Sequence, residues 1–207
     1  MSIKKILLFL LSSLFITISC NEIDPNKEIE EGEITENIYY NKEIGWKMSI
    51  PNGWEITSQD VLKKRTEDGM EKLQESIEAE YDFSELKHLI NFQKDKFHIF
   101  QSTSEPFEEE YVGEWKENSI QINQLLYYTY SNNGINIDTS SSVQTIDSVE
   151  FNVSHITMYG PKGNIILYQD MYSTYINGFD FSVNLNYIDG KKKDEMYRAW
   201  KNSTFEK

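Results

Sequence analysis

The stretch 149–189 carries the clearest pattern of apolar and polar residues in the chain. Its segments VEFNVSHITMY, IILYQDMYSTYI and FDFSVNLNYID are joined by the short sequences GPKGN and NG, which predicts three consecutive strands. Asn177-Gly178 is typical of a two-residue hairpin turn, because both central positions of a type I′ turn require positive φ. In the last segment, apolar residues alternate with polar ones from Phe179 to Tyr187, which predicts one buried face and one polar face.

Other segments show helical or strand periodicity. Apolar stripes predict helices over 59–80 and 113–131, and the segment KKKDEMYRAWKNS after Gly190 predicts a third helix. Shorter alternating segments predict strands near 46–50, 54–56 and 135–144, and a hairpin in which HLINFQ and FHIFQST pair across a turn at Lys94-Asp95.

These elements predict an α+β fold. A single antiparallel sheet of six to seven strands, with helices packed on its faces, accounts for every apolar stripe. Residues 37–205 contain no internal repeat and no Pro/Gly-rich break, so we expect one globular domain over residues 37–207.

Both ends of the predicted domain resemble a known superfamily. The phrase Y-x-N-x-x-x-G-W-x-M-S-I-P-x-G-W, which begins at Tyr39, resembles the opening of PsbP-like domains, the superfamily of the photosystem II oxygen-evolving-enhancer protein. The final helix running into Thr204-Phe205 is similar to the end of those domains. The resemblance implies an α/β/α sandwich. It also implies an accessory role, since PsbP domains generally act as helpers docked on larger complexes.

Residues 1–19 have the composition of a signal peptide. The basic pair KK is followed by the apolar run ILLFLLSSLFITI, which is short for a membrane span. Ser19 follows this run and directly precedes the only cysteine, Cys20. The sequence T-I-S-C resembles the looser lipobox of Bacteroidetes lipoproteins, which implies cleavage before Cys20 and diacylglycerol on its thiol. An ordinary secretory signal with an incidental cysteine, and an uncleaved anchor, remain alternatives.

This interpretation predicts a protein of the cell envelope. As an outer membrane lipoprotein it would face the periplasm or the cell surface, and its lipid anchor would be its contact with the membrane. The acidic segment 20–36 then predicts a flexible tether between lipid and domain. The segment also resembles the surface-export signals of Bacteroidetes lipoproteins, although a solvated spacer explains it equally well.

Charge and cysteine content exclude several classes of function. The formal net charge of −14, from 34 acidic and 20 basic residues, argues against binding to nucleic acid or to an anionic membrane surface. A single cysteine excludes a disulfide framework and a thiolate metal site. The fold must therefore rest on its hydrophobic core, for which an aromatic content of 14% is sufficient.

The pattern of chemically reactive residues predicts neither catalysis nor a cofactor. The three histidines lie on three different predicted strands, without ligand spacing for a metal. His155 is expected to be a core or half-buried residue. His88 and His98 flank the expected hairpin and would face each other across it without a carboxylate partner. No nucleophile elbow and no phosphate-binding loop is present in the sequence. We therefore expect no enzyme, no catalytic residue and no metal site.

Two features suit binding better than catalysis. The first is a set of tyrosines in which Tyr168 and Tyr172 share a strand face, and tyrosine is favoured where one end of a side chain is wet. The other members of the set are Tyr175, Tyr127, Tyr128 and Tyr130. The second is a polar strand face with Asn152, Ser154, Asp180, Ser182, Asn184 and Asn186. Core packing and helix cover are the alternatives for these two sets.

The first functional hypothesis is a lipid-anchored, non-enzymatic envelope protein with a binding or complex-assembly role and an envelope protein as partner. The second is a small-ligand or glycan binder with a tyrosine-lined pocket. A third, an unrecognised hydrolase, would require histidines and acids to converge within hydrogen-bond reach.

Overall fold

The computed structural model describes residues 24–76, 84–188 and 190–206. The predicted signal peptide and Cys20 lie outside these residues, as does the end of the helix predicted over 59–80. The described helices are α1 (Gln59–Ser76), α2 (Glu114–Asn132), α3 (Lys191–Lys201) and the short 3₁₀ helix η2 (Pro25–Glu28). None of them is long and apolar enough to cross a membrane.

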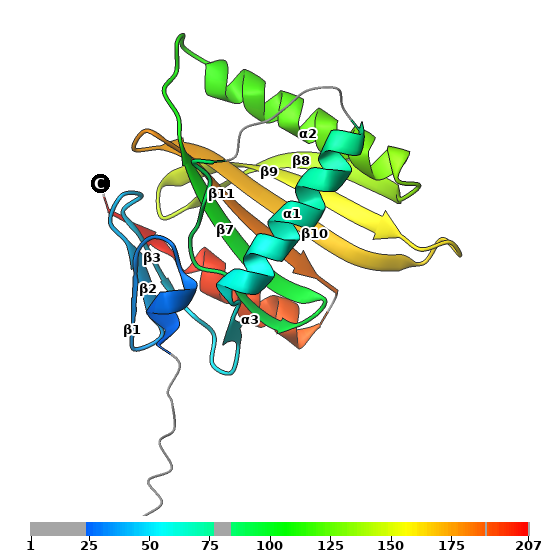
Figure 1. Cartoon of the computed structure of the whole chain (residues 1–207). Coiled ribbons are helices and arrows are strands. Elements are labelled where there is room, and N and C mark those ends of the chain that lie inside the picture. Colours follow the sequence, from blue (N-terminus) through cyan, green and yellow to red (C-terminus); the bar gives the residue numbers. More distant parts are fainter. Residues whose placement is uncertain (1–23, 77–83, 189, 207) are drawn as a thin grey trace, which may run out of the picture.

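A large antiparallel sheet forms the centre of the fold (Figure 1). Its strands follow in spatial order β4 (Glu55–Ile56), β6 (Phe92–Asp95), β7 (His98–Pro106), β11 (Phe179–Tyr187), β10 (Ile165–Ile176), β9 (Val149–Tyr159) and β8 (Asn136–Ile146), while β5 (Lys87–His88) pairs with β7. The predicted meander is present as β9, β10 and β11. Its second turn has positive φ at both Asn177 (54°) and Gly178 (84°), as the sequence predicted.

A second, smaller sheet lies beside the first. It contains β1 (Glu33–Thr35), β2 (Ile38–Asn41), β3 (Trp46–Ser49) and β12 (Thr204–Phe205), in that order. The predicted α+β class is confirmed, but the single sheet of six to seven strands was an incomplete prediction. β3 corresponds to the strand predicted near 46–50, but its pairing with β12 joins residues from the two ends of the domain, with Phe205 opposite Trp46.

Residues 24–36 differ from the flexible tether that the sequence predicted. Ile29 and Ile34 belong to the hydrophobic core, and β1 pairs with β2. The side-chain amide of Asn26 donates to Ile34 O (3.2 Å), and Asn26 Oδ1 accepts from Ile34 N (2.6 Å). Two isoleucines in an acidic segment are therefore enough to dock it onto the domain, which includes residues before Asn37.

Helices cover both faces of the main sheet. On one face α3 closes a dry core, and Met196 and Trp200 are its fully buried residues. The indole of Trp200 lies between rings of both sheets, with centroid distances of 5.9 Å to Trp46 and 5.3 Å to Phe151. The other face carries α1 and α2. Arg65 of α1 donates to Gln93 of β6 (2.7 Å).

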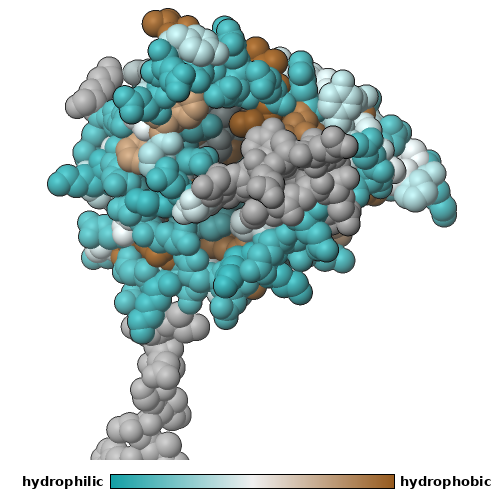
Figure 2. All heavy atoms as spheres, turned by 45° about the horizontal axis from the view of Figure 1, so that its top comes forward, coloured by the Kyte–Doolittle hydropathy of each residue, from teal (hydrophilic) through white to brown (hydrophobic). Residues whose placement is uncertain are grey.

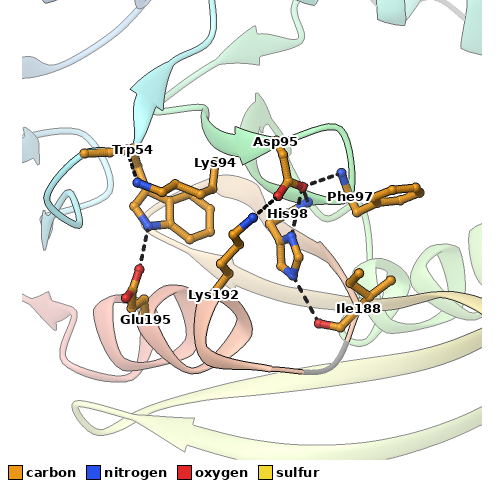
Figure 3. A network of polar contacts seen from close by, with 9 residues as sticks. Trp54, Lys94, Asp95, Phe97, His98, Ile188, Lys192 and Glu195 are labelled. Atoms are coloured by element: carbon orange, nitrogen blue, oxygen red, sulfur yellow. Dashed lines mark hydrogen bonds and ion pairs between the residues drawn. The ribbon is translucent and has the colours of Figure 1, made fainter.

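A polar network fixes the start of α3 to the β6–β7 hairpin (Figure 3). The turn of this hairpin is at Lys96-Phe97, two residues later than predicted, because the Asp95 carboxylate accepts hydrogen bonds from the backbone N–H groups of Phe97 (2.9 Å) and His98 (3.0 Å). Lys192 pairs with the second oxygen of Asp95. Burial alone would raise the pKa of Asp95, but the hydrogen bonds from Lys192, His98 and Phe97 outweigh it and hold the pKa well below its usual value.

The substitution Asp95→Asn should lower the free energy of unfolding by about 1–2 kcal/mol at pH 7, because bonds to a charged acceptor become bonds to a neutral one. The folded-state pKa is depressed, so this contribution is present above the unfolded pKa of about 3.9 and is lost as the pH falls below it. Urea unfolding at pH 7, 5, 4 and 3 should therefore show a difference from wild type that shrinks in acid.

Asp68→Asn, at an exposed position of α1, is the matched control and should change little at any pH. A difference between wild type and Asp95→Asn that persists undiminished at pH 3 would contradict this account.

Candidate functional site

Helix α2 lies over the polar face of the main sheet (Figure 1). None of its residues is buried. Its contacts with the sheet are mostly polar: Ser154 of β9 donates to Asn123 Oδ1 (2.8 Å), and Tyr130 donates to Gln169 of β10 (2.9 Å). Only the C-terminal end of α2 meets a small apolar cluster, through Tyr130. Small polar residues beneath a helix leave space, because they do not fill the distance between the two elements.

Three adjoining hollows occupy this space, with volumes of about 410, 250 and 260 Å³. Asn123 and Ser154 line all three, so their hydrogen bond forms a pillar between helix and sheet. We call the whole the α2 cleft. Besides the pillar, its main polar lining residues are Ser119, Gln124, Thr139, Ser141, Asn152, Ser173, Asp180, Ser182 and Asn184.

Several buried polar atoms in and beside the cleft have no hydrogen-bond partner. They are Asp180 Oδ1 and Asn184 Oδ1 on β11 and the indole Nε1 of Trp115 at the start of α2. Burial raises the pKa of the Asp180 carboxyl, and the neighbouring Trp115 indole opposes the rise without reaching hydrogen-bond geometry. Unpaired buried acceptors are costly, so they favour a ligand that brings hydroxyl or amine donors.

The fold itself is shared with a protein of known structure. The solution structure of cyanobacterial PsbP (CyanoP) from Synechocystis sp. PCC 6803 matches this chain with a TM-score of 0.53, covering 82% of this chain and 91% of that one. This chain has a PsbP-like fold. The sequence identity is 8%, so the likeness concerns the fold alone. No protein-family model matches the chain, and no curated protein sequence matches it.

The PsbP-like domain divides the predicted binding residues between its two sheet faces. Asn152, Ser154 and Asn184 line the α2 cleft. Asn186 lies on the same face and donates to Gln101 of β7 (3.5 Å). The sequence left two alternatives for this polar face, cover by a helix or an open surface. The structure combines them, because α2 covers the face and a cleft separates the helix from the sheet.

The two predicted tyrosines lie on the opposite face. Tyr172 is fully buried and packs against Trp200 in the core, with a centroid distance of 5.4 Å. Tyr168 is half-buried and stacks on Tyr187 at 5.4 Å. The Tyr172 side chain is thus a core side chain, although the residue also borders the second hollow of the α2 cleft from below. Tyr127 and Tyr128 border the first hollow from the helix side.

A polar chain that the sequence did not predict crosses the strands of the core face. Asp170 lies directly opposite His155 in the β9–β10 register, with Nδ1 of the imidazole 2.6 Å from the carboxylate. Nε2 of the same ring lies 2.8 Å from Ser142 Oγ on β8. Tyr187 donates to the second oxygen of Asp170 (3.0 Å). An ionised Asp170 accepts from Nδ1–H, which leaves Nε2 to accept from the Ser142 hydroxyl.

This order of groups is the one used in nucleophilic acyl transfer, but its setting differs from that of the α/β-hydrolases. Ser142 occupies the middle of a regularly paired strand, whereas the nucleophile elbow presents its serine on a strained turn. Asp170 is only 5% exposed and joins three strands through its two oxygens. The geometry therefore fits a cross-strand brace.

The other two histidines do not face each other, contrary to the prediction. His88 of β5 lies opposite Thr103 and contacts Thr66 of α1 through Nε2 (2.9 Å). His98 lies opposite Asp95 and has a carboxylate partner that the sequence did not suggest (2.9 Å). The turn at Lys96-Phe97 places Asp95 opposite His98, and β5 pairs with a more distant part of β7. In the described ranges, no three His, Cys, Asp or Glu side chains gather as metal ligands.

Sequence reasoning named Tyr127 and Tyr128 on the helix side of the cleft but missed its polar residues there. Ser119 and Asn123 are four residues apart and therefore share one helix face. A pair of small polar residues on the inward stripe of an amphipathic helix was the signal that could have revealed it.

If the chain Ser142–His155–Asp170 is a brace, Asp170→Asn should lower the free energy of unfolding by about 1–3 kcal/mol, since buried donors lose a charged acceptor, and Ser142→Ala by less than about 1 kcal/mol. Urea unfolding measures both.

A fluorophosphonate probe should label neither wild type nor Ser142→Ala. Labelling of wild type that disappears in Ser142→Ala would instead establish a reactive serine.

Proposed function

We propose that this protein is a lipid-anchored, non-enzymatic binding protein of the cell envelope with a role in complex assembly, and that the α2 cleft is where it binds. The observation that carries the proposal is the hollow contact between α2 and the sheet. A helix without a buried residue, above a polar face with unpaired buried acceptors, contributes little to packing and much to recognition.

The proposed location in the cell envelope rests on the N-terminal sequence. Cleavage after residue 19 and diacylglycerol on Cys20, as in Bacteroidetes-type lipoproteins, would place the domain on the outer membrane, facing the periplasm or the cell surface. The acidic net charge of −14 supports a protein or neutral partner and opposes nucleic acid. The PsbP-like fold supports an accessory role through the resemblance described above.

A small ligand or glycan is the second candidate occupant of the cleft. Tyr127 and Tyr128 border its largest hollow beside Gln124 and Thr139. An aromatic surface next to convergent hydroxyl and amide groups is the arrangement that sugars prefer, because their C–H faces stack while their hydroxyls form hydrogen bonds.

The lipid anchor predicts that cells fed labelled palmitate incorporate it into the wild-type protein and not into Cys20→Ala. The reason is that the cysteine thiol is the attachment point of the lipid. Equal labelling of both proteins would refute the anchor. An unlabelled wild type that is recovered from the culture medium would support the ordinary secretory signal.

The binding role predicts that wild-type protein, purified from detergent-solubilised membranes, retains a stoichiometric partner. Ser141→Trp should release that partner, because a large ring at this exposed position of β8 fills the cleft. Thr145→Trp is the matched control: it lies on the same strand and face, is exposed, and is outside the cleft lining. Mass spectrometry of the retained material measures the stoichiometry.

Recovery of the wild-type protein alone at every salt concentration would count against the assembly role. In that case a glycan array probed with wild type and Ser141→Trp decides the second candidate. Binding that is lost in Ser141→Trp and kept in Thr145→Trp supports a glycan site, and an array without signal removes it.

A further inference from the structure

The strand edges of this protein are very unequal in length. β8 closes one side of the main sheet, and its eleven residues pair with β9 in an unbroken register. In the described chain, no strand pairs with its other side. The opposite edge strand, β4, has two residues, and the outer strands of the small sheet, β1 and β12, have three and two. β8 is therefore the long edge of the described structure.

β8 also lacks the features that normally keep an edge strand from pairing with another chain. Proteins protect such edges with lysine, proline, a bulge or a very short strand, because the row of backbone N–H and C=O groups is a template for pairing. The sequence NIDTSSSVQTI contains no lysine and no proline, its one charge is Asp138, and its register with β9 shows no bulge. The other edges are protected by their length alone.

Apolar side chains flank this edge on the cleft side. Val143 of β8 is 58% exposed, and Ile120, Tyr127 and Tyr128 of α2 are 51%, 45% and 61% exposed. The hollows of about 410 and 260 Å³ lie between these two elements. Figure 2 looks towards the side that carries α2 and shows apolar atoms among hydrophilic ones on it. A strand added to β8 would present every second side chain to this flank.

We propose that β8 is a docking edge, to which a partner protein adds an extended segment as a further antiparallel strand. Backbone hydrogen bonds would supply affinity, and alternating apolar side chains lying against Val143 and Ile120 would supply specificity. A second copy of this chain fits less well, because it would bring together two chains that each carry a formal net charge of −14. The inference rests on the binding role proposed above and names the class of partner.

A phage-displayed library of eleven-residue peptides, panned against the full-length lipidated protein in detergent, tests the proposal. Selected peptides should alternate apolar and polar residues. In fluorescence anisotropy they should bind Val143→Lys at least about tenfold more weakly than wild type, since a charged side chain on an edge strand opposes pairing. Ile166→Lys makes a comparable exchange at an exposed site on β10 and should bind within about twofold of wild type.

N-methylation of alternate amides in a selected peptide should abolish binding, because those amides can no longer donate to β8. Amide exchange in residues 136–146 should slow when the unmodified peptide is bound. Three results would overturn the proposal: a library that yields no alternating peptide, binding unchanged in Val143→Lys, or a wild-type dimer in sedimentation that Val143→Lys dissociates. None of these results bears on the broader binding role, which is tested separately by recovery of a partner from membranes and by Ser141→Trp.

Discussion

The packing of one tryptophan between two sheets is the interaction on which the rest of this structure depends. Trp200 belongs to the last helix, yet its ring contacts side chains from both sheets at centroid distances of 5.3 to 6.5 Å. Its partners are Trp46, Phe100, Phe151, Tyr172, Phe181 and Phe205. Since large rings dominate the energetics of a core, Trp200 adds to the direct contact between Trp46 and Phe181 (5.1 Å) in holding the small sheet against the main one. The Asp95–Lys192 pair adds a polar constraint to the same helix.

The apolar core lies on the face of the main sheet that packs against α3, and the opposite face is polar. Alternation along β9 and β11 produces both faces: Phe151, Phe181 and Val183 point into the core, while Asn152 and Asn184 point towards α2. A helix that buries no residue can be placed at a distance from the sheet without a large loss of packing. Regions with few buried apolar contacts are the ones that open and bind most readily. The hollow beneath α2 and the uncovered edge of β8 are two consequences of this division.

Several features of the fold could be predicted from the sequence because they depend on neighbours in the chain. The β9–β11 meander, the turn at Asn177-Gly178, and helices α2 and α3 were predicted within a few residues of their observed bounds. Predictions that required distant partners were less successful. The acidic segment around Ile34 was predicted to be a tether because its composition is polar. Its isoleucines are buried because they join the same core cluster as Tyr39, which only the folded structure shows.

What the sequence by itself determined was the class of fold and which residues share a strand or helix face. Periodicity carries that information, since it follows from local geometry. What only the tertiary structure decided was the environment of each face. Asn152 and Asn184 became the floor of a cleft because α2 crosses above them. His155 gained Ser142 and Asp170 as partners because strand register, a non-local property, brought them together.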